Sequence, residues 1–348
     1  MKKSMHKLQQ GMLRAWYEQR GWLVIFRPLS ALYSRFALRK RQRYIDNPSA
    51  SWQPPVPLIV VGNVTLGGTG KTPMVIWLVE HLRSRGLRVG VISRGYGGKP
   101  PSLPWRVTPA QDDPEWVGDE PLLIARRCDV PVVIDPNRSR AGRYLLEHTP
   151  VDVIVSDDGL QHYRMGRTLE LVMIDHARGL GNARCLPEGP LREPAERLEQ
   201  VDLLVRTGAE VDADGAFAMR LQATELVNMR TGERLKPDDW RAPPRVQAVA
   251  GIGNPERFCK TLESHGLVPE IHAFADHAQY NENSFAAFDH GEPLIMTEKD
   301  AVKCAGFARD NWWYLSVEAK LSAAFIAALH AQLDKHLPSS STTTSDRS

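Results

Sequence analysis

A glycine-rich turn between an apolar strand and a helix constrains this chain more than any other feature. Residues 58–61 are apolar, the turn reads Gly-Gly-Thr-Gly-Lys-Thr, and a helical pattern follows over residues 74–85. Glycines let backbone N–H groups converge on phosphate oxygens, while the lysine can reach the β and γ phosphates and the threonine can bind Mg²⁺. The turn therefore predicts a P-loop site for ATP and Mg²⁺. The predicted nucleotide-binding residues are Thr65, Leu66, Gly67, Gly68, Thr69, Gly70, Lys71 and Thr72.

This turn departs from the standard P-loop pattern at one position. The pattern places a glycine five residues before Gly70, where this chain has Thr65. A plain turn that matches the pattern by chance is the alternative. The strand before the turn and the helix after it favour the phosphate loop.

The composition indicates a globular protein in a reducing environment. The 348 residues allow one large or two moderate domains, and 42% hydrophobic residues is ordinary for a globular core. A net charge of +3 is too small to imply nucleic acid as a partner. The four cysteines contain no Cys-x-x-Cys pair, which favours a cytosolic setting and argues against a cysteine zinc site.

Apolar runs that alternate with helical patterns predict an α/β fold. Such runs are typical of strands buried on both faces, so we predict a P-loop NTPase-like, mostly parallel sheet with helices on both faces. A second α/β unit starting at residues 246–250 predicts a smaller C-terminal lobe. The strands predicted in the first unit are residues 58–61, 87–92, 130–134, 151–156, 169–174 and 201–205. The predicted segments are an N-terminal helical segment (1–50), a P-loop core (51–217), a hairpin linker (218–240), the C-terminal lobe (241–337) and a disordered tail (338–348).

The first fifty residues interleave aromatic and aliphatic side chains with arginines. A transmembrane helix needs about 20 apolar residues, and Arg27 and Pro28 interrupt this stretch well before that length. An amphipathic helix of this composition fits a membrane interface, where arginines meet anionic head groups. The alternative is a helix that packs on the domain with its arginines in solvent. The sequence thus predicts a peripheral amphipathic helix rather than a spanning anchor.

Two adjacent aspartates follow the strand predicted at residues 151–156. Asp157 and Asp158 would lie at the carboxyl end of a parallel strand, where open α/β sheets bind ligands and where P-loop enzymes present an aspartate to Mg²⁺. A metal or an arginine would relieve the repulsion between the two carboxylates. A helix or turn cap is the alternative role. We interpret the pair as candidate magnesium ligands beside Thr72.

A third aspartate and a histidine fit acid–base chemistry. Asp119 precedes a predicted helix, and an N-cap is the alternative role for it. His277 lies beside Asp276 in a predicted loop. A carboxylate oriented by a histidine suits deprotonation of a sugar hydroxyl that attacks the γ-phosphorus. Asp119, His277 and Lys71 are therefore the candidate catalytic residues.

Arginines at predicted strand ends are candidate phosphate ligands, because a guanidinium group can donate two hydrogen bonds to one phosphate. They are Arg94, Arg138, Arg140 and Arg192, with a solvated surface arginine as the alternative, most of all for Arg140. Glu193 follows in a proline-rich loop and is a candidate Mg²⁺ carboxylate, either direct or behind another ligand. The segment 297–303 either closes over the nucleotide or only caps a helix.

Together these segments resemble the tetraacyldisaccharide 4′-kinases of lipid A biosynthesis. The resemblance extends in the family's order from about residue 14 to residue 333, and its blocks are residues 67–73, 93–97, 118–121, 157–162, 186–194, 275–277 and 297–300. It implies transfer of the ATP γ-phosphate to the 4′-hydroxyl of a tetraacylated glucosamine disaccharide 1-phosphate, an acylated lipid. It also implies a peripheral enzyme at the cytoplasmic face of a Gram-negative inner membrane.

The resemblance implies roles for single residues as well. Asp119 would be the base and His277 its partner, while Thr72, Asp158 and Glu193 would lie near Mg²⁺. The residues that would line the acceptor and phosphate site are Arg94, Arg138, Gln161, His162 and Arg192.

Two other classes of protein also contain such a phosphate loop. A nucleotide-driven switch or metallochaperone-type NTPase would hydrolyse the nucleotide only with a protein partner and would need no acyl-binding surface. A soluble kinase of small metabolites would leave residues 14–43 without a purpose. The amphipathic start of the chain counts against both.

Overall fold

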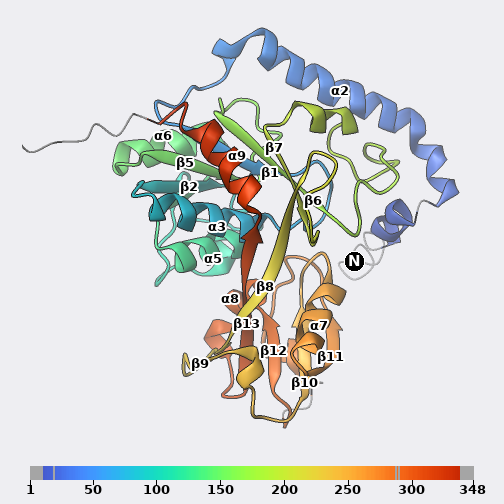
Figure 1. The fold of residues 1–348 in the computed structure, drawn as a ribbon, viewed down its shortest axis with the longest axis vertical. Helices are drawn as coiled ribbons and strands as arrows, with labels where there is room; N and C mark the ends of the chain where they lie inside the picture. Colours follow the sequence, from blue (N-terminus) through green and yellow to red (C-terminus); the bar gives the residue numbers. More distant parts are fainter. Residues whose placement is uncertain (1–10, 19, 287, 289–290, 338–348) are drawn as a thin grey trace, which may run out of the picture.

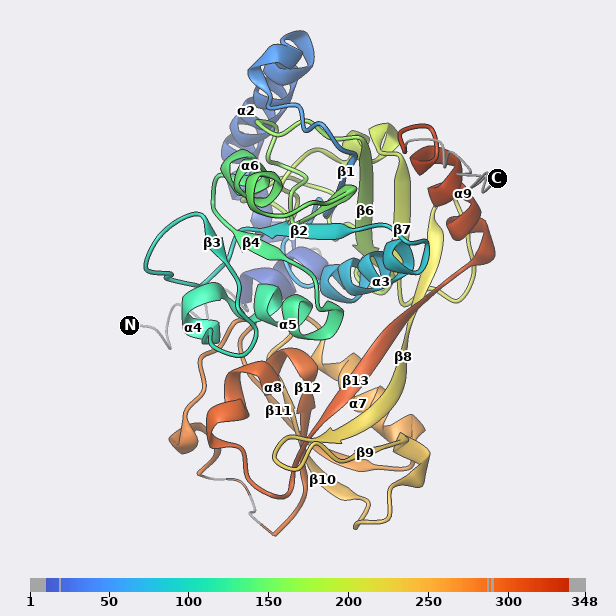
Figure 2. The ribbon, with the colours of Figure 1, turned by 90° about the vertical axis from the view of Figure 1, so that its left-hand side faces the viewer.

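The computed structural model describes residues 11–18, 20–286, 288 and 291–337. Within this part of the chain, thirteen strands form one sheet in the order β11-β10-β12-β13-β8-β7-β6-β1-β5-β2-β4-β3, with β9 paired to β8. Figures 1 and 2 show the sheet passing through two lobes. The strands are β1 (Leu58–Gly62), β2 (Val89–Ser93), β3 (Trp105–Arg106), β4 (Val132–Ile134), β5 (Val153–Asp157), β6 (Leu169–Asp175), β7 (Leu203–Thr207), β8 (Phe217–Asn228), β9 (Arg234–Leu235), β10 (Arg245–Ala250), β11 (Val268–Ala273), β12 (Leu294–Thr297) and β13 (Trp312–Leu321).

Helices cover both faces of the sheet in the first lobe. The α-helices are α2 (Arg27–Asp46), α3 (Lys71–Ser84), α4 (Pro114–Val117), α5 (Asp119–Cys128), α6 (Arg138–His148), α7 (Pro255–Ser264), α8 (Glu298–Cys304) and α9 (Ala323–Leu333), and residues 11–17 are also helical. Figure 2 shows α3 and α5 on one face of the strands and α6 on the other. This two-sided cover explains why the strands of the first lobe are apolar along their whole length.

Side chains from one strand alternate between two cores. Ile59 and Val61 of β1 pack in the cluster that contains α3 and α5, whereas Leu58 and Val60 pack in the cluster that contains α6. Strands β4, β2, β5, β1, β6 and β7 run parallel, so their carboxyl ends lie along one edge. That edge is where the predicted site residues should gather.

Two long strands connect the lobes. β8 and β13 pair in antiparallel fashion along nearly their whole lengths, with one irregularity between Ser316 and Val317. β8 also pairs with β7 of the first lobe, and β13 pairs with β12 of the second. In Figure 1 the two strands run from the upper lobe into the lower one. The chain therefore crosses between the lobes as sheet, which is stiffer than a free linker.

The predicted hairpin linker and C-terminal lobe differ in part from the observed elements. Residues 218–240 contain a hairpin of β8 and β9, but β8 is a full member of the central sheet. Helix α9 returns to the first lobe, where Phe325, Leu329 and Leu333 join the cluster of α3 and α5. Helix α9 thus packs outside the C-terminal lobe (241–337) that the sequence predicted to contain its residues. The predicted tail, residues 338–348, lies outside the described residues.

The N-terminal segment packs against the first lobe along one side only. Ala15, Trp16 and Leu23 are buried and form a small cluster with Leu66 of the glycine-rich turn. Helix α2 is attached by polar contacts, in which the Ser30 hydroxyl donates to the Cys185 carbonyl oxygen over 2.7 Å. In the part of the chain that the structure describes, no helix is both long and apolar enough to span a bilayer.

Candidate functional site

The glycine-rich turn joins the carboxyl end of β1 to the first residue of α3. Gly67 and Gly70 have φ angles of 102° and 81°, which are in the range that favours glycine. The helix begins at Lys71, three residues earlier than predicted, so its first N–H groups lie in the turn itself. Lys71 Nζ donates to Asn63 Oδ1 over 3.2 Å and lies 3.5 Å from Asp158 Oδ1. This arrangement is a phosphate-binding helix N-terminus with a lysine beside it.

The first two predicted nucleotide residues have structural contacts of their own. The Leu66 N–H donates to the Pro190 carbonyl oxygen over 2.9 Å, so this N–H is not available to phosphate. Thr65 forms a bridge with Leu191 and is buried. The Thr69 hydroxyl, by contrast, is buried without a hydrogen-bond partner. The residues placed to contact phosphate are therefore those from Gly67 onward.

A loop of the second lobe lies against the turn. Gly253 approaches so closely that a Cβ atom on it would lie 2.7 Å from the Gly68 backbone nitrogen, so only glycine fits there. Arg178, which follows β6, donates to the Gly68 carbonyl oxygen and, over 3.5 Å, to that of Gly253. The Arg178 guanidinium also lies over the Tyr17 ring, 5.4 Å from its centroid. Arg178 thus connects the turn to both the second lobe and the N-terminal segment.

A cavity of about 420 Å³ extends from the turn between the two lobes. Gly68 to Thr72 line one end, and Lys299 and Glu120 line the wall beside them. The rest of the wall is largely apolar, with contributions from Leu123, Leu221, Ile252, Phe258, Leu315 and Val317. A nucleoside triphosphate suits this shape, because its base can enter the apolar part while its phosphates lie on the turn.

Asp157 and Asp158 end β5 beside the turn, in different environments. Asp158 pairs with Lys71 and with Arg192, 3.0 Å away, and these cations lower its pKa to about 2 against the effect of burial. Its φ of 47° is unusual for a residue other than glycine, and strain of this kind is commonly found at functional sites. Asp157 accepts from the Ser93 hydroxyl over 3.0 Å and is fully buried. Burial, followed by the charge of Glu120, raises the Asp157 pKa to about 7.

The environment of Asp157 fits a divalent cation. Its Oδ1 atom is buried without a hydrogen-bond partner, so the carboxylate has an unused ligand atom within the electrostatic reach of Lys71. Among the residues that the structure describes, no cluster of three or more carboxylate, histidine or cysteine side chains could hold a metal on its own. A kinase site does not need one, because Mg²⁺ keeps several waters and binds phosphate oxygens together with one or two carboxylates.

Glu193, the third predicted magnesium carboxylate, has different partners. It is buried, and its Oε2 accepts from the Tyr163 hydroxyl over 2.6 Å and lies 3.3 Å from Arg197. Its Oε1 has no partner. Tyr163 belongs to the loop after β5, and within the described part of the chain no hydrogen bond or ion pair joins Glu193 directly to Asp157 or Asp158.

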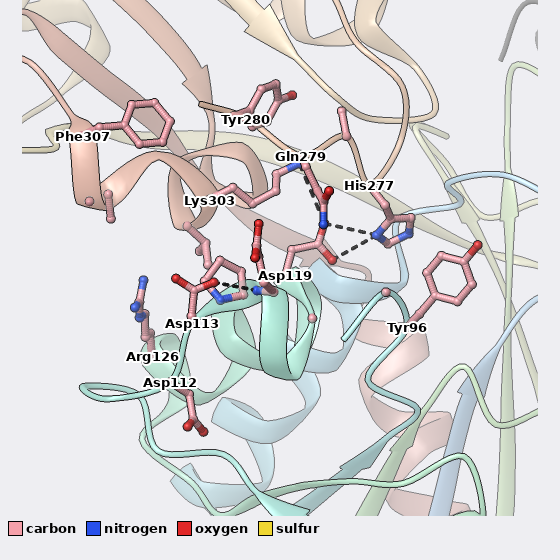
Figure 3. A pocket seen from close by; sticks show the side chains of 18 residues that line it. Tyr96, Asp112, Asp113, Asp119, Arg126, His277, Gln279, Tyr280, Lys303 and Phe307 are labelled. Atoms are coloured by element: carbon pink, nitrogen blue, oxygen red, sulfur yellow. Dashed lines mark hydrogen bonds and ion pairs between the residues drawn. The ribbon is translucent and has the colours of Figure 1, made fainter. Parts of the chain in front are cut away.

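Asp119 and His277 lie together, although 158 positions separate them in the sequence. His277 Nδ1 lies 3.0 Å from Asp119 Oδ1 and 3.1 Å from Oδ2. Two ammonium groups lie slightly farther from Oδ2, Lys299 at 3.8 Å and Lys303 at 3.9 Å. Burial raises the Asp119 pKa. The His277 hydrogen bond (Figure 3) and the charges of the two lysines lower it by a larger amount, so that the pKa falls to about 2. The carboxylate is therefore ionised at neutral pH.

His277 owes its position to an unusual backbone conformation. Its φ is 58°, and its ring contacts that of Tyr96, 4.9 Å away between centroids. Burial is the largest influence and lowers the His277 pKa, but the hydrogen bond to Asp119 and the negative charges of Asp119 and Asp276 together outweigh it and leave the pKa raised. The pair therefore combines an ionised carboxylate with a histidine that favours the charged form.

Ion pairs join helix α5 of the first lobe to α8 of the second. Lys299 Nζ lies 2.9 Å from both Glu120 Oε1 and Asp276 Oδ1. About two turns further along α5, Arg127 donates to both carboxylate oxygens of Glu298 over 2.9 Å. These contacts fix the second lobe, and His277 with it, relative to Asp119. Thr297 caps α8 by accepting from the Asp300 N–H, so the predicted capping role of segment 297–303 is present. Thr297, Glu298 and Lys299 also line the cavity that extends from the turn, and closure over the nucleotide stays a prediction.

The predicted acceptor residues form a second group near the carboxyl ends of β1 and β5. Arg192 contacts Asp158 and lies 3.3 Å from Gln161 Oε1, while the Gln161 amide donates to the Asn63 carbonyl oxygen over 3.1 Å. Arg138 is buried and donates to the carbonyl oxygens of Asp135 and Asp157. The remaining members lie further out: Arg94 contacts the Tyr96 ring and His162 is partly buried.

Sequence reasoning missed several residues of this site. Lys303 was only part of a segment whose role stayed open, and Arg178, Arg127 and Gly253 were not candidates. Lysine and arginine are common on surfaces, so no local signal separated these residues from solvated ones. Arg140, expected to be less important, pairs with Asp135 over 2.5 Å at the end of β4.

Comparisons with known proteins identify the family of this chain. A family model described as LpxK, tetraacyldisaccharide-1-P 4′-kinase, matches residues 22–334. The chain is similar to tetraacyldisaccharide 4′-kinases of Pseudomonas putida strain W619 (56% identical over 331 residues, 95% of this chain and 98% of that protein) and of Pseudomonas fluorescens strain Pf0-1 (57% over 327 residues, 94% and 97%). It is also similar to a crystal structure of LpxK from Aquifex aeolicus in complex with ATP. That match has a TM-score of 0.75 and 28% identity, and it covers 91% of this chain and 100% of the other.

Proposed function

The chain belongs to the tetraacyldisaccharide-1-P 4′-kinase family, and on that premise we propose that Asp119 is the general base of its reaction and that His277 orients Asp119. The chain is an ATP-dependent phosphotransferase that transfers the γ-phosphate of ATP to the 4′-hydroxyl of the tetraacyl disaccharide 1-phosphate in lipid A biosynthesis. One observation carries the proposal. Each lobe supplies one member of the Asp119–His277 pair, and the adjacent residues Glu120 and Asp276 line the same cavity as the phosphate loop.

The low pKa of Asp119 is compatible with this role. In a loose phosphoryl-transfer transition state the acceptor hydroxyl keeps its proton until late, so the accepting carboxylate needs orientation more than basicity. Asp119 Oδ1 is oriented by the Glu120 N–H over 2.9 Å and by His277. Oδ2 can accept the hydroxyl proton, and Lys71 with the first turn of α3 neutralises charge on the phosphates.

We include Mg²⁺ in the proposal, with Thr72, Asp157 and Asp158 as its protein-side ligands and Glu193 behind them. The unpartnered Oδ1 of Asp157 supports this assignment. The ion, when bound, would reduce the negative charge of the ATP phosphates during transfer. Arg94, Arg138, Gln161, His162 and Arg192 are proposed to bind the acceptor, since the three guanidinium groups suit its 1-phosphate and the other two side chains can form neutral hydrogen bonds.

The proposed place of action is the cytoplasmic face of the inner membrane, where the chain would bind as a peripheral protein. Four apolar side chains spaced by four, three and four residues form a stripe on one side of the N-terminal segment: Ile25 (68% exposed), Leu29 (56%), Leu32 (65%) and Phe36 (65%). Arg35 and Arg39 are exposed next to them. A stripe of this kind bordered by arginines suits the boundary between head groups and acyl chains.

Flotation with anionic liposomes tests the membrane assignment. Replacing Leu29, Leu32 and Phe36 by serine should abolish flotation, whereas Gln42→Ser on the same helix should preserve it. Unchanged flotation of the triple variant would refute the stripe as the membrane-binding surface.

The chemistry is tested by labelled ATP and the purified disaccharide lipid, with mass spectrometry of the product. The wild-type protein should add one phosphate at the 4′ position. Asp119→Asn should bind ATP but add phosphate far more slowly. An inactive wild-type protein that binds Mg²⁺-ATP normally would contradict the assignment of the acceptor.

A further inference from the structure

The backbone carbonyl oxygens of the phosphate loop all accept hydrogen bonds from other groups of the protein. This holds for each residue from 65 to 70, and the donors come from four parts of the chain outside the loop as well as from helix α3. The donors are Asn63 for Thr65 (2.8 Å) and Gly67 (3.4 Å), Tyr17 for Leu66 (3.3 Å), Arg178 for Gly68, Thr207 for Thr69 (2.7 Å) and the Met74 N–H for Gly70 (3.3 Å). No carbonyl oxygen of the loop is therefore left to point at a phosphate.

Each of these contacts also sets the direction of the next N–H group. In a trans peptide the C=O of one residue and the N–H of the next point in opposite directions, and every peptide of the loop is trans. The Gly68 carbonyl faces Arg178, so the N–H of Thr69, which lines the nucleotide cavity, faces away from Arg178. Among the described residues this N–H has no acceptor. Holding the carbonyl thus presents the N–H to a ligand.

Arg178 is itself held in place from two sides. Its backbone N–H donates to Asp175 Oδ1 over 3.1 Å, and its Nε lies 3.5 Å from the same oxygen. On the other side its guanidinium lies over the Tyr17 ring. Asp175 is buried and also lies 3.4 Å from Arg257 of α7, which lines the nucleotide cavity. The guanidinium group is therefore part of a fixed network rather than a solvated side chain.

Tyr17 brings the N-terminal segment into this network. Its hydroxyl donates to the Leu66 carbonyl oxygen, and burial raises its pKa, so the hydroxyl keeps the proton that it donates. The neighbouring Trp16 is buried, and its indole N–H donates to the Pro187 carbonyl oxygen over 3.1 Å. Tyr17 is therefore anchored at the loop by contacts that are separate from the exposed apolar stripe further along the segment.

We propose that Tyr17 and Arg178 are positioning residues for the phosphate loop, which hold the Leu66 and Gly68 carbonyl oxygens away from the triphosphate so that the following N–H groups can bind it. The N-terminal segment thereby takes part in ATP binding, in addition to its proposed attachment to the membrane. The proposal rests on the proposed binding of the triphosphate at the loop. A carbonyl oxygen turned toward a phosphate would repel it, so a released peptide both loses a donor and adds an unfavourable dipole.

Tyr17→Phe tests the contribution of the N-terminal segment, because it removes the hydroxyl and keeps the ring beneath Arg178. It should raise the dissociation constant of Mg²⁺-ATP about threefold or more, as expected for one neutral hydrogen bond, in calorimetric titrations without lipid. The dissociation constant of adenosine, which has no phosphate, should stay unchanged in ligand-observed NMR. Tyr44→Phe is the matched control, because Tyr44 belongs to α2 and its ring stacks on Tyr163 rather than on the loop.

Arg178→Lys separates positioning from charge. Lysine keeps the positive charge but lacks the planar group that contacts the Gly68 carbonyl and the Tyr17 ring together. The variant should bind Mg²⁺-ATP about tenfold or more weakly, again with unchanged adenosine binding. Arg184→Lys is the control, since Arg184 is exposed in the same loop after β6. Wild-type ATP affinity in Arg178→Lys would show that charge alone acts, and it would overturn the positioning role.

Two further results would overturn the proposal. One is an ATP affinity of Tyr17→Phe equal to that of Tyr44→Phe. The other is an equal loss of ATP and adenosine affinity, which would place the effect in the cavity rather than at the phosphates. A wild-type protein that binds ATP while the Tyr17 and Arg178 variants bind it equally well would refute this proposal alone and leave the proposed function intact.

Discussion

Asp119→Asn gives the sharpest test of how the two lobes cooperate. Asparagine keeps the size of the side chain and an oxygen that can accept the Glu120 N–H, so the start of α5 should stay intact. The variant loses the charge that faces His277 at 3.0 Å and the two lysines at 3.8 and 3.9 Å. Both lysines keep other carboxylate partners. The free energy of unfolding should therefore fall by only about 1.5–3 kcal/mol, the contribution of one charged hydrogen bond.

The expected loss of catalysis is much larger. A positioned general base contributes about 10²–10⁴-fold, which corresponds to roughly 2.7–5.4 kcal/mol of activation free energy. ATP affinity should stay the same or improve slightly, because the substitution removes a negative charge near the triphosphate. Single-turnover transfer and calorimetric titration of Mg²⁺-ATP measure the two effects separately.

A matched control lies at the other end of the same helix. Asp129 has a φ of 48°, a conformation that asparagine tolerates, so Asp129→Asn makes the same chemical change away from the site. It should transfer phosphate at the wild-type rate. A decrease of less than tenfold in Asp119→Asn, or an equal loss of ATP affinity, would refute Asp119 as the base.

Three further outcomes follow from the same contacts. Lys71→Ala should slow transfer by at least about a hundredfold, since it removes the cation at the phosphate loop, and a near-normal single-turnover rate would contradict this. His277 has a raised pKa, so its stabilising effect should be complete below its ordinary value of 6.5 and disappear as pH rises through the higher folded value. The difference in unfolding free energy between wild type and His277→Asn should accordingly be larger at pH 6 than at pH 9, and a constant difference would rule out this linkage. Arg127→Met should destabilise the protein by about 3–5 kcal/mol in urea unfolding, because it leaves Glu298 unpaired and largely buried. The exposed Arg88 of a surface ion pair serves as the control, because Arg88→Met should cost far less stability than Arg127→Met, and equal losses would contradict the distinction.

The first lobe was predictable because its signals are local. The α/β P-loop fold class and the family are confirmed by the match to the structure of LpxK with ATP and by the family model. The predicted strands are present with shifts of one or two residues, and β5 extends to Asp157, one of the predicted magnesium ligands. The phosphate loop, its lysine and the two aspartates at the end of β5 all lie next to strand ends in the sequence. The pattern of apolar strands therefore predicted that these residues meet at one edge of the sheet.

The lobes and their interface were less predictable because their signals are not local. The segment that begins at residue 218 contains the turn of a hairpin, and this signal favoured a linker. In the structure, Phe217–Asn228 instead forms one long strand that pairs with a neighbouring strand on each side. Nothing in the residues around Lys303 shows that its ammonium lies 3.9 Å from Asp119, because 184 positions separate them and only the packing of α8 on α5 joins them. The individual roles predicted for the site residues stay predictions until the variants are measured.

The continuous sheet gives a physical reason for placing the base and its partner on different lobes. Asp119 begins α5 of the first lobe, and His277 follows β11 of the second. β8 and β13 join the lobes, so a bend in this ribbon would separate Asp119 from His277 while leaving the phosphate loop and Lys71 intact. ATP binding at the loop would then be possible in an open form, whereas the oriented base would exist only in the closed one. Breaking the Arg127–Glu298 pair should therefore reduce turnover more than ATP affinity even in protein that remains folded. A parallel loss of both would mean that the ion pair supports the nucleotide cavity itself rather than the closure.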